Sequence, residues 1–529
     1  MTLEFAQPIA LGQFNSWLGD LRRNRDEIIA LARKADEYGS SVLALPFGAI
    51  TGTPLRDLSS DPRLQSLALQ TLHEISQTLQ GLGLAHLTVI GAGCFAQGDQ
   101  AFNISQGRVN YYPINTGFAL VPIQQGKTAA ATAAQSIEEV EAFTQRSDFS
   151  GSAHADYLLI LGAVPYEQDI QRRLEGSIIE LSQFVRKPVC YVNLVGGQDD
   201  LVYYGGSSVV TDHGKFLLRS PIFREHLTTS YNTDPDFLQA APETTSAQTY
   251  RAITMGLRDY VQKNAFKSVV LGLSGGIDSA LLAAVAADAV GGENVTCLAM
   301  PSPYSSQHSL DDAKDLARRI GAEYRVVPIN PAMEAFTNML PMPGLAEENL
   351  QARIRGVLLM AVSNTEGKVV LAPGNKSEIA VGYSTIYGDA VGGFAPLKDV
   401  YKSEVWELAR WRNSFALDRD ELPPIPESSI TKPPSAELRY DQVDQDSLPE
   451  YRVLDALLRD HLEGYKGRQE LITEGFDTET VDRVLKLLAI SEWKRGQYPP
   501  GPKVTSRAFN TDRKVPITNR WHDREEDNV

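Results

Sequence analysis

Short apolar runs alternate with amphipathic stretches through the first 225 residues of the chain. The apolar runs predict β-strands at residues 41–45, 86–92, 156–163 and 188–195. In residues 25–39 the apolar side chains recur with a helical period, so that they share one face of a predicted helix. Strands that alternate with such helices predict an α/β fold.

A second block with the same alternation begins near residue 250. It predicts helices at 250–266, 280–291 and 311–322, and strands at 267–273, 295–301 and 324–329. This order is typical of a doubly wound parallel sheet with helices on both faces. Residues 227–248 are polar and contain two prolines, so they predict a linker between domains at 1–226 and 249–529.

Composition narrows the classes of function. The formal net charge of −16 and the isoelectric point of about 5.1 argue against a nucleic-acid-binding surface. No apolar run reaches the ~18 residues of a membrane span, and the first residues lack the pattern of a secretory leader. Cys94, Cys190 and Cys297 are too few and too widely spaced for a disulfide framework or a zinc site. We therefore expect a cytoplasmic protein that binds neither nucleic acid nor membranes.

One segment carries a clear chemical pattern. Ser274-Gly275-Gly276-Ile277-Asp278-Ser279 stands between the strand predicted at 267–273 and the helix predicted at 280–291. Such a turn directs free N–H groups and the positive end of the helix toward one point, where a phosphate group can bind. Two glycines allow the backbone to approach phosphate oxygens closely. The serines can add hydroxyl donors, and Asp278 can hold Mg²⁺.

A tight turn of small residues would also contain two glycines. The complete six-residue pattern between a strand and a helix favours a nucleotide site instead. The segment is not a Walker A loop, because the lysine of GxxxxGK[ST] is missing. It resembles the pyrophosphate-binding loop of the ATP-pyrophosphatase superfamily, whose members adenylate a substrate, release pyrophosphate and then admit a nucleophile.

Further segments select one family within that superfamily. They are MPSPYSS (300–306), EENLQARIRGVLLM (347–360), GNKSEIAVGYSTIYGD (374–389), PLKDVYKSEVWEL (396–408), PPSAELR (433–439) and ISEWKRGQYPPGPKV (490–504). Together they resemble NAD⁺ synthetase over almost all of residues 250–520. The resemblance implies an ATP-pyrophosphatase fold and a reaction in two steps. The carboxylate of deamido-NAD⁺ attacks the α-phosphate of ATP, and ammonia then displaces AMP.

The same resemblance implies the site residues. The catalytic candidates are Asp278, Glu378 and Lys402; the two acids would hold Mg²⁺, and the lysine would neutralise ATP phosphates. The further ATP-binding candidates are Gly272, Ser274, Gly275, Gly276, Ser279, Pro373 and Ser435. The candidates that would bind deamido-NAD⁺ are Asn349, Arg353, Glu378, Asp389 and Lys494. Taken singly, Glu378, Lys402 or Arg353 could equally be a solvated charge or part of an ion pair.

Residue 373 departs from the family pattern. The family usually has a threonine here that touches ATP, whereas Pro373 has neither a hydroxyl nor a backbone N–H. The change removes a contact of about 1 kcal/mol.

The first domain has a resemblance of its own. ALGQFNSWLGDLRRN (10–24), ALPFGAITGTPLRDL (44–58), LGAVPY (161–166) and YVNLVGGQDDLVYYGGSSVV (191–210) resemble the nitrilase-type glutaminase domain of long NAD⁺ synthetases, an αββα sandwich. That domain hydrolyses glutamine with a glutamate base, a lysine and a cysteine nucleophile. The surrounding residues align Phe47 with the glutamate, and a phenyl ring cannot accept a proton.

The other two catalytic groups are missing or unsupported. The nucleophile should precede LGAVPY, yet no cysteine occurs between Cys94 and Cys190, and both of these lie in or beside apolar strands. Lys127 is the one plausible lysine, and its neighbours do not match the family motif. We therefore predict that Phe47 fills a degenerate glutaminase site and that the domain keeps a structural role.

The predicted function is ATP-dependent amidation of deamido-NAD⁺ to NAD⁺ by a homo-oligomer that uses Mg²⁺. The nitrogen source would be ammonia, either free or from a separate partner protein. The first alternative is a glutamine-dependent NAD⁺ synthetase with relocated glutaminase residues. The second is a non-catalytic regulatory or scaffold protein, against which the complete loop and Glu378 argue.

Overall fold

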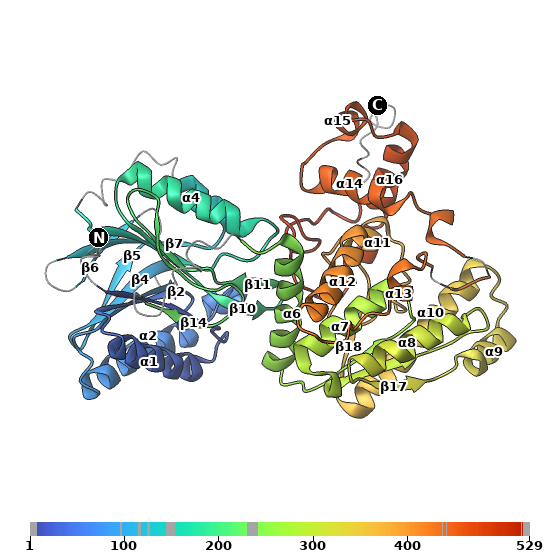
Figure 1. Cartoon of the computed structure of the whole chain (residues 1–529), viewed down its shortest axis with the longest axis horizontal. Helices are drawn as coiled ribbons and strands as arrows, with labels where there is room; N and C mark the ends of the chain where they lie inside the picture. Colours follow the sequence, from blue (N-terminus) through green and yellow to red (C-terminus); the bar gives the residue numbers. More distant parts are fainter. Residues whose placement is uncertain are drawn as a thin grey trace. The chain divides into compact units, whose positions relative to one another are not determined.

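The computed structural model describes residues 8–95, 98–114, 118–123, 127–143, 154–229, 242–435, 437–440, 442–519 and 521. The chain divides into two compact units, Met1–Glu243 and Thr244–Val529 (Figure 1). In the described part of the chain, no helix is both long and apolar enough to cross a membrane.

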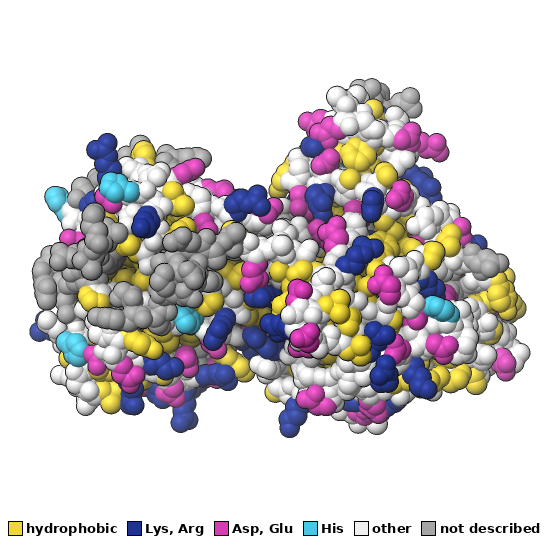
Figure 2. Space-filling model, in the orientation of Figure 1, with side chains coloured by type: hydrophobic (Ala, Val, Ile, Leu, Met, Phe, Trp, Pro, Cys, Tyr) yellow, Lys and Arg dark blue, Asp and Glu magenta, His cyan; other side chains and the backbone are white. Residues whose placement is uncertain are grey.

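Charged side chains of both signs are interspersed over the surface in Figure 2. On this face the lysines and arginines alternate with aspartates and glutamates and form no continuous basic band.

Within its described residues, the first unit contains two six-stranded sheets. The first has the order β14-β1-β2-β3-β4-β5, with strands at His226–Thr228, Ile9–Gln13, Val42–Phe47, Thr88–Phe95, Gly98–Ser105 and Arg108–Pro113. The second has the order β13-β12-β9-β8-β7-β6, with strands at Phe216–Arg219, Ser208–Val210, Val189–Asn193, Tyr157–Gly162, Thr128–Ala134 and Ala119–Pro122. A two-stranded ribbon consists of β10 (Val195–Gln198) and β11 (Leu201–Tyr204).

The two sheets pack face to face through apolar side chains. Leu11 and Ala44 of the first sheet share one buried cluster with Leu161 and Val192 of the second. The outer faces are covered by α1 (Leu21–Glu37) and α2 (Pro62–Gly81) on one side and by α3 (Ile137–Phe143) and α4 (Ile170–Val185) on the other (Figure 1). The predicted four-layer αββα arrangement is confirmed.

The structure corrects both ends of the predicted linker. Residues 226–228 form β14, an edge strand that pairs antiparallel with β1. Its three residues, His-Leu-Thr, are too few to show an alternating pattern. As an edge strand it gains stability from backbone pairing with one neighbour. At the other end, α6 begins at Thr245, and the Thr244 side chain caps it. Residues 230–241 of the predicted linker lie outside the described residues.

The second unit contains, among its described residues, one four-stranded sheet in the order β17-β16-β15-β18 with every pair parallel. Its strands are Glu323–Val326, Val295–Ala299, Val269–Gly272 and Val369–Leu371. The surrounding helices are α6 (Thr245–Lys263), α7 (Ile277–Val290), α8 (Gln307–Arg319), α9 (Asn330–Met339), α10 (Leu345–Glu366), α12 (Lys402–Leu417) and α13 (Glu427–Thr431). This is the doubly wound fold class that the sequence predicts.

The helices of this unit form separate layers. Val270 and Val370 of the sheet pack with Met333 of α9 and Ile354 of α10. Helices α6, α7 and α12 pack together, and α7 also contacts β15 and β16. The apolar residues of α7 leave almost no polar face, as expected for a helix between a sheet and other helices.

Helix α11 (Lys376–Val381), which follows β18, packs against helices from the last part of the chain and forms a helical cluster with them. The cluster consists of α11, α14 (Tyr451–Leu462), α15 (Arg468–Thr473), α16 (Thr478–Ile490) and α17 (Glu492–Arg495). Leu454, Val484 and Leu488 share a buried cluster with Ile379 of α11. Helix α11 is therefore held firmly, although it is only six residues long.

Phe47 is the last residue of β2 and is 3% exposed. It belongs to the cluster between the two sheets of the first unit, together with Ala92 and Ala163. The ring is therefore a core side chain, as predicted for a residue that fills space. The loss of glutaminase activity stays a prediction.

Truncating Phe47 tests its part in this core. Phe47→Ala should lower the free energy of unfolding by about 3–5 kcal/mol, because a buried ring is replaced by a cavity. Phe184 of α4, which is 60% exposed, provides a matched control, and Phe184→Ala should cost less than about 1 kcal/mol. Urea denaturation of the full chain, followed by hydrogen exchange of first-unit peptides, measures both losses. Equal losses would contradict the core position of Phe47.

Candidate active site

A cavity of about 670 Å³ lies at the carboxyl ends of the parallel strands in the second unit. Gly272 at the end of β15, Met300 just after β16 and Leu371 at the end of β18 line it. Strand β18 comes last in the chain, yet it lies beside β15 on the side opposite to β16. The strand order therefore reverses beside β15, and ligands of open α/β sheets bind at such a switch point.

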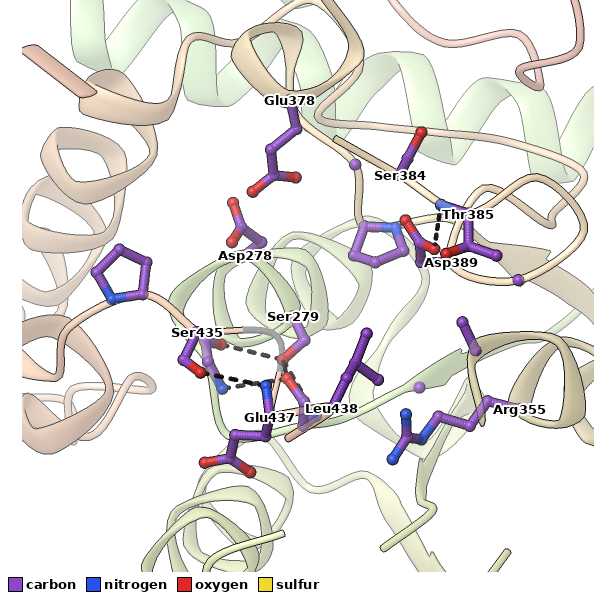
Figure 3. Close-up of a pocket in the computed structure, with 18 of the residues that line it drawn as sticks. Asp278, Ser279, Arg355, Glu378, Ser384, Thr385, Asp389, Ser435, Glu437 and Leu438 are labelled. Atoms are coloured by element: carbon purple, nitrogen blue, oxygen red, sulfur yellow. Dashed lines mark hydrogen bonds between the residues drawn. The ribbon is translucent and has the colours of Figure 1, made fainter. Parts of the chain in front are cut away.

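Most of the predicted site residues line this cavity. They are Gly272, Ser274, Gly276, Asp278, Ser279, Asn349, Pro373, Glu378, Asp389, Lys402, Ser435 and Lys494. Gly275 and Arg353 are not among the lining residues. Figure 3 shows the carboxylates of Asp278 and Glu378 turned toward each other, with Asp389 and Thr385 on another wall.

The loop between β15 and α7 is held in shape by its own serines. Ser274 Oγ and Ser279 Oγ lie 3.0 Å apart, and Ser279 Oγ donates to Gly276 O at 3.0 Å. Gly276 N in turn donates to Ser274 Oγ at 3.2 Å. Gly276 precedes α7 and has no side chain with which to cap it. The first turn of α7 lines the cavity, so its N–H groups and the helix dipole are available to an anion.

Gly275 contributes to the loop through its backbone conformation. Its φ is +82°, and a Cβ at this position would lie 2.3 Å from the backbone oxygen of Ser309. The loop therefore packs directly against the start of α8, and only glycine permits both this contact and this conformation. Gly275 shapes the loop from behind the cavity wall.

A buried lysine bridges the two predicted acids. Lys402 has a side chain that is 2% exposed, and its ammonium group contacts Asp278 Oδ2 and lies 3.0 Å from Glu378 Oε1. Asp278, Glu378 and Lys402 stand in the first turns of α7, α11 and α12. Three helix N-termini thus meet at one point, which favours negative charge there.

The charges at this point are unbalanced. Burial raises the pKa of Glu378 to about 8; Lys402 lowers it, whereas Asp278 and Asp444 raise it. Burial alone would lower the pKa of Lys402, but the carboxylates of Asp278 and Glu378 raise it well above its ordinary value. Asp444 also lines the cavity, so three carboxylates surround one ammonium group. Ionisation of all three carboxyl groups would leave an excess of negative charge, so an additional cation and the ionised form of Glu378 favour each other.

The two predicted acids fit Mg²⁺. No three His, Cys, Asp or Glu side chains in the described residues are grouped so as to hold a metal ion by themselves. Mg²⁺ in nucleotide sites commonly takes one or two carboxylates and completes its oxygen ligands with phosphates and water. Asp278 and Glu378, which face each other in the cavity, therefore suit a magnesium ion that arrives with a nucleotide.

Another wall of the cavity gathers predicted residues around the loop 382–389. Asn349 Oδ1 accepts a hydrogen bond from Thr385 Oγ1 at 2.8 Å, and Asp389 Oδ1 accepts one from Thr385 N at 2.8 Å. Lys494 Nζ donates to Gly382 O at 2.7 Å and to Ser384 O at 2.8 Å. Burial lowers the pKa of Lys494, and the nearby Asp389 raises it.

Arg353 is not among the residues that line the cavity, but it lies beside the loop 382–389 and close to Lys494, and its part in binding deamido-NAD⁺ stays a prediction. Its side chain is exposed, and its Nε donates to Ile386 O at 3.3 Å. Arg355 lines the cavity instead, because two residues along a helix point in nearly opposite directions. Arg355 Nε donates to Met300 O at 3.0 Å, and burial lowers the pKa of Arg355 to about 10.

The segment around Ser435 is anchored beside the start of α8. Ser435 Oγ accepts a hydrogen bond from Glu437 N at 3.2 Å. Glu437 Oε1 accepts from Ser309 Oγ and from Lys432 Nζ, both at 2.7 Å. Lys432, which the sequence reasoning did not single out, therefore joins Ser435 in the cavity wall.

Asn375 is another residue that the sequence reasoning missed. Its Nδ2 donates to Asp278 Oδ1 at 2.9 Å, and its Oδ1 accepts from Glu378 N at 3.0 Å. A sequence signal did exist, since an asparagine three residues before a glutamate marks a helix start. Asp444 gave no such signal, because it lies in the irregular segment η5 (Asp444–Asp446).

The thiols of the first unit are not activated. Burial and the neighbouring Asp99 raise the pKa of Cys94, and burial raises the pKa of Cys190 well above its ordinary value. A nucleophilic cysteine needs the opposite shift. The stretch expected to hold the nucleophile includes the turn between β7, which ends at Ala134, and α3, which begins at Ile137. The sequence of this turn contains no cysteine. Residues 144–153 of that stretch lie outside the described residues.

Comparison with known proteins agrees with the geometry of the cavity. The family model described as NAD synthase matches residues 249–498. The chain is 38% identical to a glutamine-dependent NAD(+) synthetase of Acinetobacter baylyi and to one of Rhodobacter capsulatus. The alignments cover 97% of this chain and 98% and 99% of the two relatives.

A solved structure extends this agreement to three dimensions. The glutamine-dependent NAD+ synthetase of Acinetobacter baumannii, in complex with adenosine diphosphate, is 34% identical, with a TM-score of 0.70. The match covers 98% of this chain and 100% of that one. Because these similarities extend over both units, the chain belongs to the NAD⁺ synthetase family.

Proposed function

We propose that this chain converts deamido-NAD⁺ to NAD⁺ with ATP, through an adenylated intermediate and with release of pyrophosphate and AMP. The observation that carries the proposal is the contact of Lys402 with Asp278 and Glu378 beside the open first turn of α7. A pyrophosphate leaving group spreads negative charge over its oxygens, and an ammonium group and backbone N–H donors stabilise that charge.

The rest of the cavity suits the second substrate. The carboxylate of deamido-NAD⁺ is ionised at neutral pH, so its attack on ATP needs orientation more than a general base. Asn349, Asp389 and Lys494 supply polar groups from three different elements around the loop 382–389. The ammonium group of Lys494 and the amide of Asn349 would orient the pyridine carboxylate, and Asp389 would accept hydrogen bonds from other groups of deamido-NAD⁺. Ammonia would then displace AMP from the adenylate.

Asp278 and Glu378 would hold the magnesium ion in this proposal, and the ion would neutralise part of the phosphate charge. Lys402 lies between the same two carboxylates and would supply a second positive charge to the phosphates.

The nitrogen donor of the second step is either glutamine or ammonia. The relatives are named glutamine-dependent, which favours glutamine as the nitrogen source and thus the first alternative. The residues of the first unit favour ammonia, because Phe47 replaces a base and the pKa values of Cys94 and Cys190 are raised. We propose that this chain uses ammonia. A homo-oligomeric state and a separate ammonia-supplying protein stay predictions.

The nitrogen source can be measured by NAD⁺ formation from deamido-NAD⁺, ATP and Mg²⁺, with either ammonium chloride or ammonia-free glutamine. We expect a rate at least about a hundredfold lower with glutamine, because a missing general base alone costs that much. Release of glutamate serves as an independent readout of glutamine hydrolysis. Equal rates would overturn the ammonia proposal, and loss of glutamine use in Cys94→Ser would then identify a relocated nucleophile.

The shape of the phosphate loop can be tested at Gly275. Gly275→Ala should lower kcat/KM for ATP about a hundredfold or more, because the loop can no longer direct its donors at the phosphates. Gly321→Ala is the matched control: Gly321 has a φ of +71°, but no heavy atom lies within 4 Å of the point that a Cβ would occupy there. It should cost about 1 kcal/mol of stability and leave kcat/KM unchanged. Similar kinetics for the two variants would contradict the role of Gly275.

A further inference from the structure

Asn375 joins the two predicted magnesium ligands through one side chain. It is fully buried, donates from Nδ2 to Asp278 Oδ1 and accepts at Oδ1 from Glu378 N. The partners fix which end of the amide is which, because a carboxylate can only accept and a backbone N–H can only donate. Both bonds have ordinary lengths, 2.9 Å and 3.0 Å.

The bond to Asp278 makes the two oxygens of that carboxylate unequal. Oδ1 is held by the amide of Asn375, whereas Oδ2 contacts the ammonium group of Lys402. The carboxylate therefore cannot rotate freely about its last bond. Oδ2 is therefore the oxygen that faces the cations of the cavity, and the ammonium group of Lys402 is one of them.

The bond to Glu378 sets the position of the second acid. Asn375 is the N-cap of α11, and its side chain accepts from the third residue of that helix. Helix α11 spans only Lys376–Val381, so its first turn carries most of its length. A change at the cap would therefore move the Glu378 carboxylate as well as release Asp278.

We propose that Asn375 is a positioning residue for divalent-cation binding: it holds Asp278 and Glu378 at a fixed separation and orientation before the cation arrives. This inference rests on the proposed function only in taking these two acids as the magnesium ligands. When a group that hydrogen-bonds to a metal-ligating carboxylate is removed, the affinity for the metal typically falls by about 10–100-fold.

The test uses Asn375→Ser in the full chain. Serine is a good N-cap and keeps an acceptor for Glu378 N, but it has no amide that could reach Asp278. Binding of ATP is followed by the shift in melting temperature as Mg²⁺ is titrated, with deamido-NAD⁺ absent, and a parallel titration of ATP is made in EDTA.

Asn413→Ser is the matched control. Asn413 also uses both ends of its amide, donating to Ile425 O at 2.8 Å and accepting from Ile425 N at 3.1 Å, and it does not line the cavity. Asn413→Ser should lower the melting temperature of the protein and leave its response to Mg²⁺ unchanged.

We expect Asn375→Ser to raise the half-saturating Mg²⁺ concentration at least about tenfold, while ATP binding in EDTA matches that of the wild type. An unchanged Mg²⁺ response, or an equal rise in Asn413→Ser, would overturn the proposal. The titration does not depend on NAD⁺ synthesis: a wild type that binds Mg²⁺ and ATP but forms no NAD⁺ would refute the proposed function and leave the role of Asn375 standing.

Discussion

The synthetase site depends on one buried ammonium group between two carboxylates. Lys402 has almost no contact with solvent, and without Asp278 and Glu378 its charge would be costly to bury. The acids in turn need the lysine, since Asp444 adds a third negative charge nearby. Removing Lys402 would leave the two buried acids without their cation. The remaining excess of negative charge makes the same cluster a receptive site for a divalent cation.

The fold brings these charges together from distant parts of the chain. Asp278 follows β15, Glu378 follows β18, and these two strands are neighbours in the sheet although about 100 residues separate them in sequence. Lys402 begins α12, whose packing with α6 and α7 fixes its direction. The helical cluster around α14 and α16 holds α11 in place. The geometry of the charges is thus a consequence of the strand order and of two apolar cores.

Sequence periodicity predicted the α/β class of both units, because buried strands and amphipathic helices leave strong patterns, whereas the four-layer arrangement of the first unit came from its resemblance to a known domain. Periodicity missed β14, because three residues are too few to show a period, although two of them are buried. Most of the candidate residues that the resemblance to NAD⁺ synthetase implied lie in the cavity wall. Arg353 lies beside the loop 382–389 without lining the cavity, and the charges of its segment do not reveal which flank of α10 faces the cavity. Asp444 and Lys432 could not be found, since they reach the cavity from irregular segments that no periodicity describes.

The central claim is that Lys402 and its two acids activate ATP for attack by a carboxylate, independently of the nitrogen source. Exchange of labelled pyrophosphate into ATP, with deamido-NAD⁺ present and every nitrogen donor excluded, isolates that step. We predict exchange in the wild type that requires deamido-NAD⁺, and a loss of at least about a hundredfold in Lys402→Met. Exchange that persists in Lys402→Met, or that is absent from the wild type, would contradict the account.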